Sequence, residues 1–85
     1  MGGYNVLIRR SAEREIRELP AAVRRLVVGR ILALQDEPRP HGTQKLSGQD
    51  GHRLRQGDYR IVYTIDDALR TVTVVRVAHR SDVYR

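Results

Sequence analysis

Apolar residues recur with two different periods along this chain. Tyr4–Ile8 ("YNVLI") is rich in residues typical of strands and predicts a short strand. From Ser11 onward the apolar positions are three to four residues apart, which predicts a helix with Ser11 as its N-cap. Pro20 should end this helix and start a second one over 21–35, forming a helical hairpin. The second helix has an apolar stripe of Val23, Val27, Ile31 and Leu34, widened by Leu26 and Leu32.

The second half of the chain predicts strands. The segment 36–51 is rich in turn residues and is expected to be a loop. Three strand-like runs follow at 52–56, 59–65 and 71–77, with connections short enough for antiparallel hairpins. Helices grouped before strands indicate an α+β fold, with both helices on one face of a small sheet. Residues 1–85 are expected to form a single domain.

The alternation of side chains predicts which way the meander strands face. Leu54 should face the helices, so Arg53 and Arg55 should point to the opposite, open side. On the next strand Ile61 belongs to the apolar face, which puts Arg60 on the open side as well. The run 71–77 is apolar on both faces, and its facing does not follow from the pattern.

Three guanidinium groups on one side of a sheet repel one another, so their grouping favours an anionic ligand. Two alternatives stay open: the groups are surrounded by solvent alone, or they are neutralised by nearby carboxylates, the candidates being Asp50, Asp58 and Asp82. The formal charge of the chain is +6, and Lys45 is its only lysine. This balance is typical of nucleic-acid-binding domains, although it also suits a merely solvated surface.

Composition excludes other classes. The 85 residues contain no cysteine, which rules out a disulfide framework or a thiolate metal site and suits a reducing cytoplasm. No apolar run approaches the ~20 residues of a membrane span, and no signal-peptide pattern opens the chain. We therefore expect a cytoplasmic protein with no membrane partner.

Three residues suited to chemistry follow the last predicted strand in "VAHRSDVYR": His79, Arg80 and Tyr84. Histidine titrates near neutrality, and nearby cations would lower the pKa of a tyrosine. Each residue also has a structural interpretation: a hydrogen bond at the strand end for His79, an ion pair with Asp82 for Arg80, and cover of the core for Tyr84.

Three motifs together resemble the RelE/ParE superfamily of toxins: "KLSG" in the loop, the hairpin "HRLRQGDYRIVY" and the terminal "HRSDVY". The resemblance is closer to the RelE branch. It implies the toxin of a type II toxin–antitoxin pair that enters the ribosomal A site and cuts mRNA without a metal or other cofactor. The RNA 2′-hydroxyl attacks the adjacent phosphate, which requires a general base, a general acid and cations. Implied partners are a RelB-like antitoxin, the ribosome and mRNA, with operator DNA contacted only through the antitoxin.

The resemblance also implies site residues. Arg60 corresponds to a phosphate-stabilising arginine, whereas His79 and Tyr84 compete for the role of general base. His52 stands where an aromatic residue is common, as packing or as a further titratable group. The catalytic candidates are Arg60, Arg80, Tyr84 and His79, and the RNA- or phosphate-binding candidates are Arg53, Arg55 and Lys45.

Two alternatives to an RNA-cutting toxin are compatible with the same fold and charge. The first is a ParE-like inhibitor of DNA gyrase that cuts no RNA. The second is a catalytically silent relative that is kept for antitoxin-dependent operator binding.

Overall fold

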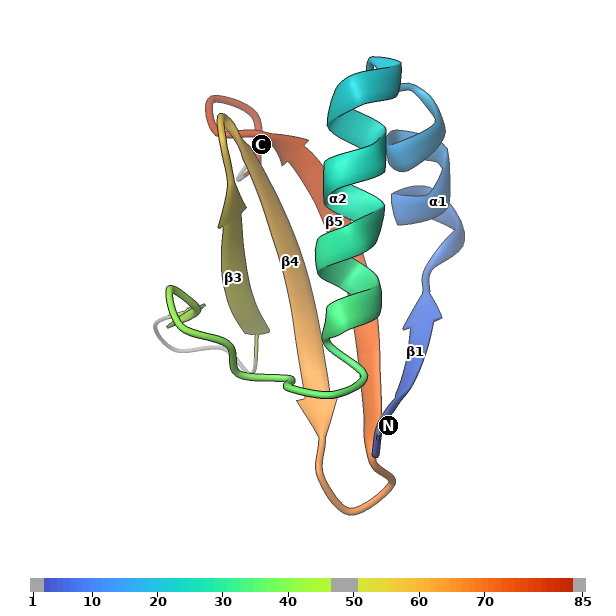
Figure 1. Ribbon diagram of the computed structural model, residues 1–85, viewed down its shortest axis with the longest axis vertical. Helices are drawn as coiled ribbons and strands as arrows, with labels where there is room; N and C mark the ends of the chain where they lie inside the picture. Colours follow the sequence, from blue (N-terminus) through green and yellow to red (C-terminus); the bar gives the residue numbers. More distant parts are fainter. Residues whose placement is uncertain (1–2, 47–50, 84–85) are drawn as a thin grey trace.

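The computed structural model describes residues 3–46 and 51–83, which contain five strands and two helices (Figure 1). The strands form one sheet in the order β1-β5-β4-β3-β2. β1 runs parallel to β5, and every other neighbouring pair is antiparallel. The elements are β1 (Asn5–Ile8), α1 (Arg10–Arg17), α2 (Ala21–Ala33), β2 (Gln44–Lys45), β3 (Gly51–Gln56), β4 (Tyr59–Asp66) and β5 (Thr71–His79).

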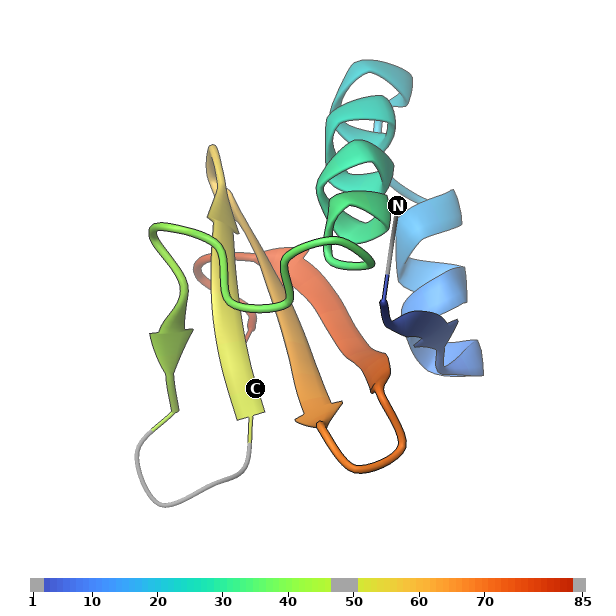
Figure 2. The ribbon, with the colours of Figure 1, turned by 60° about the horizontal axis from the view of Figure 1, so that its bottom comes forward.

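The helical hairpin covers one face of the sheet, and the opposite face carries no helix in the described residues (Figure 2). Apolar side chains of both helices and of three strands meet in one core between the layers. Burial of each large apolar side chain stabilises the fold by about 1.5–3 kcal/mol relative to its exposure. The predicted α+β architecture is confirmed. The core consists of Ala12, Ile16, Leu19, Val27, Ile31, Leu34, Leu54, Ile61, Tyr63, Val72, Val74 and Val77.

The start of α1 differs from the prediction. Arg9, not Ser11, is the N-cap, and its side chain makes no capping hydrogen bond. The backbone N–H of Arg9 donates to the carbonyl of Val74 (3.0 Å), so pairing with β5 continues up to the residue before the helix. Sheet pairing therefore sets this helix start, and no side-chain cap is used.

The second helix is shorter and has a narrower apolar face than predicted. It ends at Ala33, two residues before the expected end. Leu26 and Leu32 lie on its outer face and are 56% and 53% exposed, so they do not widen the core stripe. The reason is that α2 packs against α1 and the sheet, which leaves its outer face exposed. Neither described helix is long and apolar enough to cross a membrane.

The expected loop at 36–51 contains a strand that the sequence pattern missed. β2 is only two residues long and pairs antiparallel with β3, with Gln44 opposite Arg53 and Lys45 opposite His52. Neither side chain of β2 is buried, so no apolar alternation marks it. Backbone pairing alone defines this edge strand.

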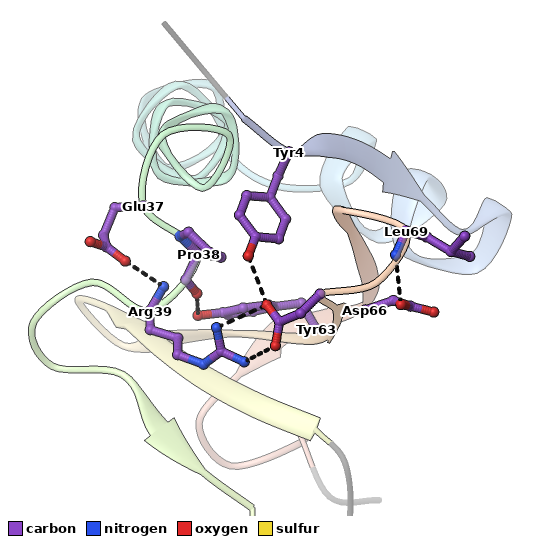
Figure 3. Close-up of polar contacts among 8 residues, drawn as sticks. Tyr4, Glu37, Pro38, Arg39, Tyr63, Asp66 and Leu69 are labelled. Atoms are coloured by element: carbon purple, nitrogen blue, oxygen red, sulfur yellow. Dashed lines mark hydrogen bonds and ion pairs between the residues drawn. The ribbon is translucent and has the colours of Figure 1, made fainter.

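A polar clasp holds the α2–β2 segment across the helix side of the sheet (Figure 3). The buried hydroxyl of Tyr63 donates to the carbonyl of Pro38 (2.8 Å). Arg39 forms a bidentate pair with Asp67 (3.2 and 2.9 Å), and Tyr4 donates to the same carboxylate (2.7 Å). Hydrogen bonds from Arg39 and Tyr4 lower the pKa of Asp67. The clasp thereby fixes the path that carries the chain to β2.

A β-bulge interrupts the pairing of β4 with β5. The register shifts between Val62 and Tyr63, whose partners on β5 are Arg76 and Val74, so Val75 has no partner opposite it. The extra residue changes the phase of the strand. Three side chains of β5 are buried, and their spacing shows this change: Val72, Val74 and Val77. Before the bulge the even-numbered residues Val72 and Val74 face the core. After it the odd-numbered Val77 does, so each later residue points to the side opposite to the one that unbroken alternation predicts.

Helix α1 also covers part of the outer edge of β5. One oxygen of the Glu15 carboxylate accepts a hydrogen bond from the backbone N–H of Val77 (2.8 Å). The other oxygen lies 3.4 Å from Nε of Arg76. This contact satisfies a strand edge that β1 is too short to reach, and it engages Arg76 with an acid.

Candidate functional site

Four arginines lie close together at one end of the open face of the sheet. We call Arg53 and Arg55 of β3, Arg60 of β4 and Arg80 after β5 the arginine cluster. Arg55 is directly opposite Arg60 across the β3–β4 ladder, so the two side chains leave the sheet on the same side. Leu54 and Ile61, their neighbours along the strands, are buried on the helix side. The predicted facing of both strands is confirmed.

Arg60 is held in place by the backbone of the β3–β4 turn. Its Nη1 donates to the carbonyl of Gly57 (3.0 Å) and to that of Tyr59 (2.9 Å). Gly57 has a φ of 59°, a conformation that a residue without Cβ adopts at little cost. The turn therefore orients the guanidinium before any ligand arrives.

The electrostatics of Arg60 favour an incoming anion. Burial lowers the pKa of Arg60, and the positive charges of Arg55, Arg53 and Arg80 lower it further, while Asp58 acts in the opposite direction. A guanidinium remains charged in spite of such effects, because its ordinary pKa lies far above neutral pH. The like charges therefore stay close together, and a bound anion would relieve their repulsion.

Asp58 is one of the carboxylates that could neutralise the cluster, and its described ion pair is a weak one. Asp58 lies 3.6 Å from Nε of Arg80, with both side chains well exposed, and such pairs contribute only about 0–1 kcal/mol. The backbone N–H of Arg80 also donates to the carbonyl of Asp58 (2.7 Å), which fixes the segment after β5 beside the turn. Asp82 lines a hollow beside His79, and Asp50 lies outside the described residues. Asp58 is thus paired with one member of the cluster, Arg80.

A hollow of about 640 Å³ opens beside the cluster. Four arginines line it, and no acidic side chain does. Its size lies within the ~300–1,000 Å³ that is common for ligand sites. The lining residues are Arg30, Gly42, Gln44, Arg53, Arg55, Gln56, Gly57 and Arg60.

His79 lies on the helix side of the sheet and not with the arginine cluster. It is opposite Tyr59, and the two rings meet edge to face with centroids 5.5 Å apart. Its Nδ1 accepts a hydrogen bond from the backbone N–H of Ser81 (3.2 Å). The bulge at Val75 causes this placement, since it reverses the facing of the last residues of β5. Tyr84, the other candidate base, lies outside the described residues.

Lys45 is also on the helix side, because it pairs with His52. The His52 ring is buried and stacks on Tyr63 with centroids 5.6 Å apart. Burial lowers the pKa of His52, and the charges of Arg39 and Lys45 add to this effect. His52 thus packs in the structure, and Lys45 is separate from the arginine cluster.

The structure adds residues that sequence reasoning did not select. Arg30 projects from α2, while Gln44 and Gln56 come from β2 and the end of β3; all three line the same hollow. Arg30 directly precedes the core residue Ile31, so its place beside the apolar stripe was visible in the sequence. Its distance from the arginine cluster was not, because it depends on how α2 packs over the sheet.

Comparison with known proteins agrees with this architecture. The chain is 34% identical to toxin RelE of Mycobacterium tuberculosis over 84 residues, covering 96% of this chain and 87% of the relative. It is 36% identical to toxin RelG of the same organism, covering 96% and 97%. Among solved structures, the toxin–antitoxin complex RelBE2 of M. tuberculosis matches with a TM-score of 0.82 at 33% identity, covering 96% and 97%. The isolated E. coli RelE toxin matches with a TM-score of 0.79 at 26% identity, covering 91% and 84%.

The arrangement of this chain, with a helical hairpin on one face of the sheet, is therefore the fold of the RelE toxins. The model of one family, described as the ParE toxin of type II toxin–antitoxin systems, matches residues 6–84. The chain belongs to this family, within the RelE/ParE superfamily, and is a RelE-like toxin of the type II class.

Proposed function

We propose that this toxin is a ribosome-dependent mRNA endonuclease that stops translation. The observation that carries the proposal is the arginine cluster, a group of cations on the open face whose like charges act on Arg60. In the proposed reaction the 2′-hydroxyl of one nucleotide attacks the adjacent phosphorus. The bond to the 5′-oxygen breaks, leaving a 2′,3′-cyclic phosphate and a free 5′-hydroxyl. Negative charge builds up on the phosphoryl oxygens, where preorganised donors lower the barrier.

The cluster supplies such donors from β3, from β4 and from the segment after β5. Arg60, oriented by two backbone carbonyls, would stabilise the charge on the scissile phosphate, and Arg80 would clamp it from the segment after β5. Arg53 and Arg55 would orient the RNA electrostatically, because arginine is a poor proton carrier. No metal takes part in this proposed reaction.

We assign the general base to Tyr84 in preference to His79. His79 lies on the other face of the sheet from Arg60, packed against Tyr59. A base must come within hydrogen-bond reach of the attacking hydroxyl. Replacing Tyr84 with Phe should therefore slow cleavage by about 100-fold or more, whereas His79→Gln should change it by less than tenfold. The opposite ranking of the two rates would overturn this assignment.

The proposed partner is a RelB-like antitoxin, since the related M. tuberculosis and E. coli toxins were solved in toxin–antitoxin complexes. An acidic or amphipathic antitoxin segment could cover the cationic face. Contact with operator DNA would occur only through the antitoxin. Ribosomes and mRNA place the proposed action in the cytoplasm.

Primer extension on cellular mRNA tests the proposal. After induction, new 5′ ends should appear within a translated message and should be absent from the same message without a start codon. The Arg60→Ala variant should abolish these ends and the growth arrest together. Growth arrest with the message intact would refute the proposal.

Inhibition of DNA gyrase is a second candidate function, because the matching family description is that of the ParE toxin. Purified toxin would then block supercoiling by gyrase and leave RNA intact. A variant with both His79 and Tyr84 replaced by alanine would remain toxic, since neither residue would have a proton to transfer.

A further inference from the structure

The hollow beside the arginine cluster extends around an edge of the sheet. β2 pairs with only two residues of β3, Arg53 and His52. From Leu54 onward, β3 therefore has no neighbouring strand on that side in the described residues. The hollow lies along this unpaired edge, with Arg53, Arg55 and Arg60 reaching it from the sheet and one more arginine reaching it from a helix.

That further arginine is Arg30, on the C-terminal half of α2. Its side chain is half-buried and makes no hydrogen bond or ion pair with the described residues. Arg60, by contrast, is bonded to two carbonyls, and Arg80 is paired with Asp58. Arg30 is thus a cation at the wall of the hollow whose donors bond none of the described residues, so a ligand can reach them there.

The chemistry of the lining suits a sugar–phosphate chain better than a peptide. Its side chains are four guanidinium groups and two carboxamides, and its other two residues are glycines. An amphipathic peptide helix would need apolar contacts, which this lining lacks. Phosphate oxygens and ribose hydroxyls are matched by guanidinium and amide donors.

We propose that Arg30 binds a backbone phosphate of the RNA adjacent to the scissile one, after the strand passes over the free edge of β3. This inference rests on the proposed function and extends it, because it gives the RNA a path from the open face to α2. Arg30 acts as a positioning residue, since it lies outside the arginine cluster at which bonds change.

Salt-dependent RNA binding tests the proposal directly. The probe is a fluorescent single-stranded RNA octamer with 2′-O-methyl groups, which cannot be cleaved, and its dissociation constant is measured by anisotropy at increasing NaCl. Each phosphate contact contributes about 0.7 to the slope of log affinity against log salt for single strands. Arg30→Gln should therefore reduce the slope by about 0.7, and Arg30→Lys should restore it. Arg25→Gln is the matched control, because it removes an exposed charge of the same helix that lies outside the hollow. It should reduce the salt slope by less than Arg30→Gln does.

The outcomes separate this inference from the proposed function. An unchanged slope for Arg30→Gln, or no binding of the octamer by the wild-type toxin, would overturn the role of Arg30. The role of Arg30 would also be overturned if Arg30→Gln lost affinity for the antitoxin and kept its affinity for RNA. Cleavage on programmed ribosomes is measured separately. There Arg30→Gln should raise the half-saturating toxin concentration and leave the maximal rate unchanged, whereas a wild-type toxin that cuts nothing refutes the function itself.

Discussion

Replacement of Arg60 with Gln should separate catalysis from folding. The substitution keeps a polar side chain but removes the charge that the β3–β4 turn orients. Loss of one preorganised donor commonly slows a reaction by a factor of ~100 or more, equivalent to about 2.7 kcal/mol of transition-state stabilisation. The rate of RNA cleavage should therefore fall by about two orders of magnitude.

Folding should respond much less. Arg60 shares one Nη1 between the carbonyls of Gly57 and Tyr59, at a turn where water can replace it, so the net loss is about 1 kcal/mol. The variant also removes the repulsion between Arg60 and Arg55, which lie directly opposite each other, and this stabilises the fold by roughly 0.2–1 kcal/mol. The free energy of unfolding should thus change by less than about 1 kcal/mol. In a domain of this size such a change shifts the Tm by no more than a few degrees.

The assay combines single-turnover cleavage on programmed ribosomes with thermal unfolding of the same samples. Arg17→Gln is the charge-matched control, because it removes an exposed arginine of α1 that pairs only weakly with Glu13 (3.6 Å). It should retain both the rate and the Tm. A cleavage rate for Arg60→Gln within about threefold of wild type would refute the assignment of Arg60. A drop in Tm well beyond 8 °C would refute the stability estimate.

Two further predictions concern the clasp that holds the α2–β2 segment. Tyr63→Phe leaves a buried carbonyl without its donor and should lower the free energy of unfolding by about 1–3 kcal/mol in urea titrations; Tyr59→Phe, whose hydroxyl makes no described hydrogen bond, should change it by less than about 0.5 kcal/mol. Equal effects of the two variants would contradict this. Hydrogen bonds, above all the one from Arg39, lower the pKa of Asp67 in the folded protein. The ionised carboxylate therefore stabilises the fold above the unfolded pKa of about 4, and this contribution is lost as pH falls through the lower folded pKa. Asp67→Asn should therefore weaken the acid-induced loss of stability below about pH 4, and acid unfolding curves of equal steepness would argue against the clasp.

Local periodicity was enough to predict most of the fold and the direction in which the arginines of β3 and β4 point. The spacing of Val27, Ile31 and Leu34 predicted which side of α2 is buried, and the structure confirms it. Alternation around Leu54 and Ile61 predicted that the arginines beside them leave the other face of the sheet. Such inferences succeed because the direction of a side chain within one regular element depends only on that element.

Tertiary contacts decided what local periodicity could not. The facing of β5 was undetermined because a bulge, set by pairing with β4, shifts its phase at Val75 and turns His79 toward the helices. β2 depends on backbone pairing at the sheet edge, and Arg30 joins the hollow only through the packing of α2. A bulge, an edge strand and a helix position each depend on residues far away in the chain. The sequence by itself therefore determined the arginine face, and only the tertiary structure decided which groups share it and where the hollow leads.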